Sequence, residues 1–322
     1  MDRRTFIATV AGGFLAEPFA VVAKQPTIMR RVGLLSAGSV VPALRAAFIE
    51  SLANLGWIEG KNVIVEWRFA ENKLERLPEL AAELIRLKPD VIVAGGTLAP
   101  LALNRATATI PIVMASAGAP VESGLVTSLA RPGGNITGLS SNSLELAGKR
   151  LQLLKEILPA VSRVAVVWNA ANPYPAVVLQ QTKEAAPALG IEILSFEVRG
   201  PADVAGALES VMRQRPNALI IVEDPLTINE RDYIVEFTAS NRLPAMYGVR
   251  EFVVAGGLIA YGANLADLLR RSAGYVDKIL RGAKPGDLPI QLPTTFELAI
   301  NLKTAKALGL TIPQSVLLRA ER

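Results

Sequence analysis

Short apolar runs alternate with segments of helical periodicity along almost the whole chain, and this alternation most restricts the possible folds. Some runs are continuously apolar, for example residues 164–167 and 218–222. A strand that is apolar on both faces is covered by helices on both sides, as in parallel sheets. Alternating strands and helices over this length predict a doubly wound α/β protein.

The same pattern gives the expected elements. Strands are expected at residues 32–35, 63–69, 91–94, 112–115, 136–139, 164–168, 192–198, 218–222, 245–247 and 258–261. Helices with apolar positions three or four apart are expected at 44–55, 74–87, 144–158, 176–189, 204–213, 228–241 and 265–280. Each half begins with a strand, a turn of small or polar residues and a long helix. With 51% hydrophobic residues, the chain is predicted to form two doubly wound lobes joined by a hinge.

Residues 1–23 have the composition of an export signal. Arg3 and Arg4 precede an apolar stretch at 6–15, Pro18 follows it, and small residues stand at Ala20 and Ala23. The first residues also resemble a twin-arginine signal, although Asp2 replaces the usual Ser or Thr. The Sec route and the twin-arginine route both stay open, as does an uncleaved amphipathic start. No later stretch is long and apolar enough for a membrane span.

The chain contains no Cys and no His. Serine or cysteine nucleophiles activated by His are therefore excluded, and zinc or copper would need carboxylates alone. No lipid-modified Cys can anchor the chain, and we expect no metal and no cofactor. An enzyme is disfavoured, although a doubly wound enzyme with Glu223 or Asp224 as general base stays an alternative.

Charge and glycine patterns argue against nucleic-acid and nucleotide ligands. The net charge of +5 is scattered, and the basic pairs Arg30-Arg31 and Arg270-Arg271 have no interleaved aromatic residues. No G-x-G-x-x-G follows a predicted strand. The nearest approach to a P-loop, residues 257–262, continues with Ala263 and Asn264 instead of Lys and Ser or Thr.

Small and polar residues follow the predicted strands and are the candidates for a ligand site. In parallel sheets the carboxyl ends of the strands border the ligand crevice. The candidates are Ser36, Thr97, Leu98, Ser116, Gly118, Asn169, Asn172, Glu223, Asp224, Tyr247 and Tyr261. Residues 96–99 place a hydroxyl at a helix start, which favours a carboxylate. Helix capping alone is an alternative for Thr97 and Asp224. Candidates for stacking on a ring are Tyr174, Tyr247, Tyr261, Trp168 and Phe252.

Several stretches carry a family resemblance. They are residues 48–52, 55–57, 89–93, 120–121, 124–126, 128–138, 243–247 and 301–310. In order and coverage they resemble the substrate-binding proteins of ABC transporters, a family that includes binders of aromatic amino acids and has the type I periplasmic-binding-protein fold. The run at 128–138 is the most specific part. The resemblance spans nearly all of the chain after the export signal.

This resemblance implies three crossings between lobes. Lobe 1 would hold residues 30–140 and 263–287, and lobe 2 would hold 141–262 and 288–322. A small ligand would be captured by lobe closure, with Ser36, Thr97 and Ser116 facing the cleft and with Asn169 and Tyr247 or Tyr261 closing over it. Relatives commonly carry Asp where this chain has Ala119, so other small carboxylates or aromatic acids stand beside amino acids as ligands.

The implied setting is the periplasm. The expected partners are the membrane permease and ATPase of an ABC importer, and the expected state is a monomer. A subunit that senses the ligand for a membrane receptor is the alternative, because sensing and uptake both need only closure.

Overall fold

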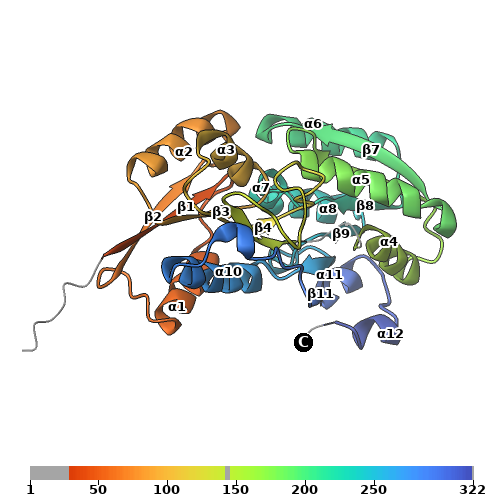
Figure 1. Cartoon of the computed structure of the whole chain (residues 1–322). Coiled ribbons are helices and arrows are strands. Elements are labelled where there is room, and N and C mark those ends of the chain that lie inside the picture. Colours follow the sequence, from red (N-terminus) through yellow and green to blue (C-terminus); the bar gives the residue numbers. More distant parts are fainter. Residues whose placement is uncertain (1–28, 142–145, 321–322) are drawn as a thin grey trace, which may run out of the picture.

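The computed structural model describes residues 29–141 and 146–320, which form two α/β lobes (Figure 1). The predicted export signal lies outside the described residues. The sheet of lobe 1 is parallel throughout. Its strands, in spatial order, are β2 (Val63–Phe69), β1 (Arg30–Ser36), β3 (Val91–Gly95), β4 (Ile112–Ala117) and β5 (Ile136–Ser140).

The sheet of lobe 2 is parallel except at one edge. Its strands, in spatial order, are β11 (Phe296–Ile300), β10 (Ile259–Ala263), β9 (Ala245–Tyr247), β8 (Ala218–Ile221), β6 (Arg163–Asn169) and β7 (Glu192–Val198). Strand β11 is antiparallel to β10 and was not predicted. It is a short edge strand that includes Glu297, so it lacks the continuous apolar run of a central strand.

Helices cover both faces of each sheet, as the apolar strands require. In lobe 1, α1 (Pro42–Asn54) and α10 (Leu265–Leu280) lie on one face, and α2 (Leu77–Arg86) and α3 (Leu98–Ala106) on the other. In lobe 2, one face carries α4 (Leu146–Ile157), α5 (Pro173–Ala185), α11 (Leu302–Ala307) and α12 (Gln314–Leu317). The other carries α6 (Pro201–Arg213), α7 (Pro225–Asn229), α8 (Arg231–Ser240) and α9 (Glu251–Val254). The predicted α/β class with two doubly wound lobes is confirmed.

The predicted helices differ from the observed ones mainly at their ends. The segment expected as one helix at 228–241 is divided at Glu230 into α7 and α8. Helix α5 begins at Pro173, earlier than predicted, because Asn172 caps it by accepting the Tyr174 N–H. Three short 3₁₀ turns account for other differences. The turn η1 (Leu74–Arg76) begins the segment predicted as a helix at 74–87, and η2 (Pro187–Leu189) ends the one predicted at 176–189. The turn η3 (Pro285–Asp287) lies in the connection after α10.

The chain returns to lobe 1 at α10, which packs against α1 and the sheet of lobe 1. It stays there beyond residue 287, the boundary expected from the sequence. The Ile290 N–H donates to the Leu129 carbonyl at 2.8 Å, and the Gln291 N–H donates to the Gly138 carbonyl at 3.0 Å. Across residues 29–141 and 146–320, no helix combines the length and apolar character needed to cross a bilayer.

Candidate ligand-binding site

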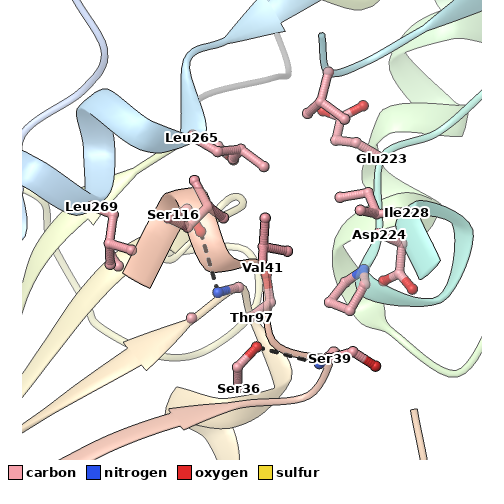
Figure 2. Close-up of a pocket in the computed structure, with 18 of the residues that line it drawn as sticks. Ser36, Ser39, Val41, Thr97, Ser116, Glu223, Asp224, Ile228, Leu265 and Leu269 are labelled. Atoms are coloured by element: carbon pink, nitrogen blue, oxygen red, sulfur yellow. Dashed lines mark hydrogen bonds between the residues drawn. The ribbon is translucent and has the colours of Figure 1, made fainter. Parts of the chain in front are cut away.

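A cavity of about 170 Å³ lies where the strand ends of the two lobes meet. Lobe 1 contributes the ends of β1, β3 and β4 together with α1 and α10, and lobe 2 contributes the turns before α5 and α7. In Figure 2, Ser36 and Ser116 face Glu223 and Asp224 across this space. A volume of this size corresponds to roughly ten water molecules and is therefore enough for a small organic ligand.

Of the serines that line the cavity, Ser36 and Ser116 lie at strand ends of lobe 1. Ser36 Oγ accepts the Gly38 N–H at 3.3 Å, and Ser116 Oγ accepts the Gly96 N–H at 3.3 Å. Each hydroxyl uses its oxygen as an acceptor in these bonds and is bonded to no acceptor of its own within the described part of the chain. A serine hydroxyl also has one proton to donate. Both serines are therefore oriented by backbone bonds and can donate to an oxygen of a ligand.

A large part of the lobe 1 wall is apolar and forms what we call the apolar chamber. We use this name for Leu34, Val41, Leu44, Trp67, Phe69, Val93, Ala115, Leu265 and Leu269, which all line the cavity. Most of these residues belong to the core cluster on the sheet face that α1 and α10 cover. The Trp67 and Phe69 rings are stacked with centroids 6.1 Å apart, and the Arg45 guanidinium lies 4.9 Å from the centroid of the Trp67 ring. This surface favours a flat or apolar group.

Thr97 also lines the cavity, but its hydroxyl has a structural role. Its oxygen accepts the Gly118 N–H at 3.1 Å and lies 3.5 Å from the Gly118 carbonyl. The side chain does not cap α3. Thr97 is only 2% exposed and holds the start of α3 against the end of β4. Its contribution to a ligand therefore comes mainly through the loop that it positions.

On the lobe 2 wall, Asp224 is bonded within its own lobe. Its carboxylate accepts the Asn169 amide at 2.8 Å, the Asn172 amide at 2.7 Å and the Leu226 N–H at 2.8 Å. The last bond caps α7. Burial raises the pKa of Asp224 above its usual 3.8, although the three donors act in the opposite direction. Asp224 therefore ties the turn after β6 to the turn after β8.

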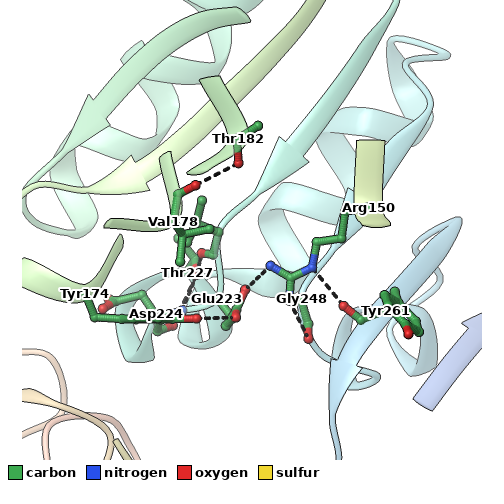
Figure 3. A network of polar contacts seen from close by, with 10 residues as sticks. Arg150, Tyr174, Val178, Thr182, Glu223, Asp224, Thr227, Gly248 and Tyr261 are labelled. Carbon is green, nitrogen blue, oxygen red and sulfur yellow. Dashed lines mark hydrogen bonds and ion pairs between the residues drawn. The ribbon is translucent and has the colours of Figure 1, made fainter. Parts of the chain in front are cut away.

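Glu223 is the second carboxylate on this wall. It accepts the Tyr174 hydroxyl at 2.6 Å and the Arg150 guanidinium at 2.8 Å (Figure 3). Arg150 is 1% exposed and also donates to the Tyr261 carbonyl at 2.8 Å. A buried guanidinium needs this set of partners, because an unpaired buried charge is strongly destabilising. The network holds the buried Tyr174 ring in the wall of the cavity.

The structure brings most of the predicted residues together. Ser36, Thr97, Ser116, Gly118, Asn172, Glu223 and Asp224 line the cavity. Leu98 and Asn169 do not line it and instead border a smaller pocket beside Asp224. Their placement follows from Asn169 pointing its amide at Asp224 and from Leu98 lying in the first turn of α3.

The two tyrosines expected to cover the ligand lie elsewhere. Tyr247 is fully buried, stacked on Phe252 with centroids 4.5 Å apart, and burial raises its pKa to about 12. Tyr261 packs against the lobe 2 core and Phe296. Strand β10 continues to Ala263, so Tyr261 lies within the strand and its side chain faces a covered sheet surface. Tyr174 lines the cavity, whereas Tyr247 and Tyr261 do not.

Contacts across the cavity show that the lobes are in close approach. The Asn229 amide of lobe 2 donates to Ser39 Oγ of lobe 1 at 3.0 Å. A Cβ added to Gly38 would lie 3.3 Å from the Cβ of Pro225, which begins α7. The residues that make these contacts also line the cavity.

The chain matches the family model described as ABC transporter substrate binding protein over residues 36–322. The chain belongs to this family. A tyrosine-binding protein of Clostridioides difficile (strain R20291) is 26% identical over 266 residues, which are 83% of this chain and 76% of the relative. The predicted family and the type I periplasmic-binding-protein fold are confirmed.

Two solved structures are informative as a pair. A protein from Streptococcus pneumonia in complex with L-Trp is 26% identical, with a TM-score of 0.84 over 91% of this chain and 98% of that one. A ligand-free, open substrate binding protein with adhesive properties from Clostridium difficile is also 26% identical, with a TM-score of 0.65 over 89% and 97%. At equal identity, this substrate-binding protein superposes better on the ligand-bound relative, in agreement with the contacts between its lobes.

Two important residues were not predicted for the site. Tyr174 follows a strand end, as the predicted residues do, and was considered only as a partner for a ring. Arg150 had a detectable signal, because it falls on the buried stripe of α4 with Ala147, Leu151 and Leu154. A charged residue on such a stripe requires a buried partner, but the sequence does not say which one.

Proposed function

We propose that this substrate-binding protein binds an α-amino acid with an aromatic side chain and delivers it to an ABC importer. One observation carries the ligand class: the same cavity combines an apolar chamber, two oriented hydroxyl donors and two carboxylates. An aromatic amino acid has a ring, a carboxylate and an ammonium group in complementary positions. The tyrosine-binding relative and the relative solved with L-Trp support this assignment.

In this proposal each lobe recognises a different part of the ligand. The ring enters the apolar chamber, and the ligand carboxylate accepts from the hydroxyls of Ser36 and Ser116. The ammonium group faces Glu223 and Asp224, which take the role that Ala119 cannot fill. Ala119 itself is buried among residues of the lobe 2 core. Closure then brings Tyr174 of lobe 2 against Gly118 of lobe 1 in the wall of the cavity.

The protein captures its ligand without chemical change. The family model is one of substrate-binding proteins, and the curated relative is named a tyrosine-binding protein, which supports capture without catalysis. The proposal therefore assigns binding and no catalysis, and it includes no cofactor, metal or nucleic acid.

The proposed setting is outside the cytoplasm. Residues 1–23 act as the export signal, the closed protein acts as a monomer, and a membrane permease with its ATPase receives the ligand. The sequence pattern of that segment and membership of the family support this setting.

Isothermal titration calorimetry with L-tyrosine, L-tryptophan and L-phenylalanine tests the ligand class. Two tyrosine analogues serve as matched controls: tyramine lacks the carboxylate, and 3-(4-hydroxyphenyl)propionate lacks the ammonium group. Each analogue should bind about tenfold more weakly or worse, because it leaves cavity groups without a partner. Equal binding of the analogues, or binding of a sugar or nucleoside in place of amino acids, would contradict the proposal.

A further inference from the structure

Gly118 and Tyr174 form an unusually close contact between the lobes. Gly118 directly follows β4 of lobe 1, and Tyr174 lies in the first turn of α5 in lobe 2. A Cβ added to Gly118 would overlap the Cγ, Cδ2 and Cε2 atoms of the Tyr174 ring. The ring therefore lies directly on the Gly118 backbone, which no residue with a side chain would permit in this arrangement.

The Tyr174 ring cannot easily move aside. It is 4% exposed, and its hydroxyl donates to Glu223 at 2.6 Å. Glu223 is in turn fixed by Arg150 at 2.8 Å (Figure 3). The overlap includes Cγ, the ring atom nearest the main chain, so a small tilt of the ring would not remove it. A larger rotation would break the bond to Glu223.

We propose that the lobes can close fully only because Gly118 has no side chain where it meets the Tyr174 ring. A side chain at position 118 would therefore hold the lobes apart. Glu223 and Arg150 are positioning residues, because they fix the ring that must meet the Gly118 backbone. Position 118 then controls affinity through closure and not through a bond to the ligand. The inference rests on the closure mechanism proposed above but not on which ligand is bound.

Cross-linking across the cleft tests this proposal without a ligand. Ser39 and Asn229 lie on opposite lobes, and their side chains are 3.0 Å apart in the closed arrangement. The chain has no Cys, so Ser39→Cys and Asn229→Cys provide the only two thiols. A short bis-maleimide joins these thiols when the lobes approach, and its rate of intramolecular cross-linking reports closure.

The variant Gly118→Ala is compared with Gly206→Ala in this background. Gly206 is exposed in α6, and a Cβ added there meets nothing within 4 Å. Gly118→Ala should lower the cross-linking rate about tenfold or more, because the overlap must be relieved before the lobes meet. Gly206→Ala should retain the parental rate. Gly38→Ala should have an intermediate effect, since its added Cβ would lie 3.3 Å from Pro225.

A variant without the Tyr174 ring shows whether Gly118→Ala acts through this contact or has a general effect on the protein. In the Tyr174→Ala background the overlap is absent, so Gly118→Ala should then change the rate little. A parental rate for Gly118→Ala would overturn the proposal. The same fold-change with and without the Tyr174 ring would also overturn it.

The ligand proposal is tested separately on the parental protein. If that protein fails to bind L-tyrosine, L-tryptophan and L-phenylalanine, the proposed ligand class is wrong. A slower cross-linking rate in Gly118→Ala would nevertheless support the contact. The two failures can therefore be distinguished.

Discussion

The two walls of the cavity use their polar groups differently. In lobe 1, Ser36 and Ser116 are oriented by backbone N–H groups and keep their own protons for a ligand. In lobe 2, Asp224 and Glu223 are bonded extensively to groups of the same lobe. Lobe 1 therefore presents hydroxyl protons to the cavity, whereas lobe 2 presents carboxylates that are braced within their own lobe. A wall that must keep its shape during closure benefits from such bracing.

The largest expected effect tests the bracing of lobe 2. Arg150→Met leaves Glu223 buried without its cation and should lower the free energy of unfolding by about 3–5 kcal/mol. Urea denaturation measures this loss. Arg199→Met is the matched control, because the Arg199–Glu197 pair has side chains that are 69% and 53% exposed. The control should change stability by less than about 1 kcal/mol; similar losses in both variants would show that the buried network does not brace the lobe.

The next effect tests recognition by lobe 1. Ser36→Ala and Ser116→Ala each remove a hydroxyl donor to a ligand carboxylate and should weaken binding of L-tyrosine by about 1.5–3 kcal/mol. Calorimetry measures the change, with Ser210→Ala, a half-buried serine of α6 that does not line the cavity, as the control. Unchanged affinity in both cavity variants would show that Ser36 and Ser116 do not bind the ligand carboxylate.

A smaller effect tests the apolar chamber. Leu269→Ala removes three carbon atoms from a residue that lines the cavity, and affinity for aromatic amino acids should fall by about 1–2 kcal/mol. The matched control, Leu302→Ala, changes a leucine that is 57% exposed at the start of α11. Calorimetry with L-tyrosine should detect no change for the control. Equal affinities for the Leu269 variant and the parent would place the ring outside the chamber.

The smallest effect concerns the charge of Asp224. Burial raises its pKa above 3.8, so it takes up a proton at a higher pH than an ordinary aspartate. Its attraction for an ammonium group is present above that raised pKa and is lost as the pH falls through it. Affinity for L-tyrosine should therefore decrease as the pH falls through this raised pKa, by less than about tenfold. Calorimetry should show a smaller pH dependence in Asp224→Asn; an identical dependence would assign it to another group.

Stability should respond to the same group in the opposite direction. The pKa of Asp224 is raised in the folded state, so the fold is more stable when Asp224 is protonated than when it is charged. This contribution is fully present below the ordinary pKa of 3.8. This contribution is lost as the pH rises through the folded-state pKa. Urea denaturation of the parent and of Asp224→Asn, at pH values from below 3.8 up through the folded-state pKa, measures this difference in stability.

Local patterns were enough to predict most of the secondary structure and the general position of the site. Continuous apolar runs such as the one in β6 identified central parallel strands, because both faces of these strands are buried. Small and polar residues after the strands identified residues of both cavity walls, since carboxyl strand ends face the crevice in this class of fold. Strand β11 was not predicted. It lies at the edge of its sheet with one neighbouring strand, so its apolar pattern is weaker than that of a central strand.

The sequence by itself determined the two-lobed α/β class and the family, and it indicated Ser36 and Ser116, which line the cavity. Only the tertiary structure decided that Tyr174, and not Tyr247 or Tyr261, borders the cavity and that Arg150 is the partner of Glu223. Periodicity reports which face of an element is buried, within a few residues along the chain. The contacts of Glu223 with Tyr174 and Arg150 join residues 49 and 73 positions apart, and they depend on side-chain direction and the approach of whole elements.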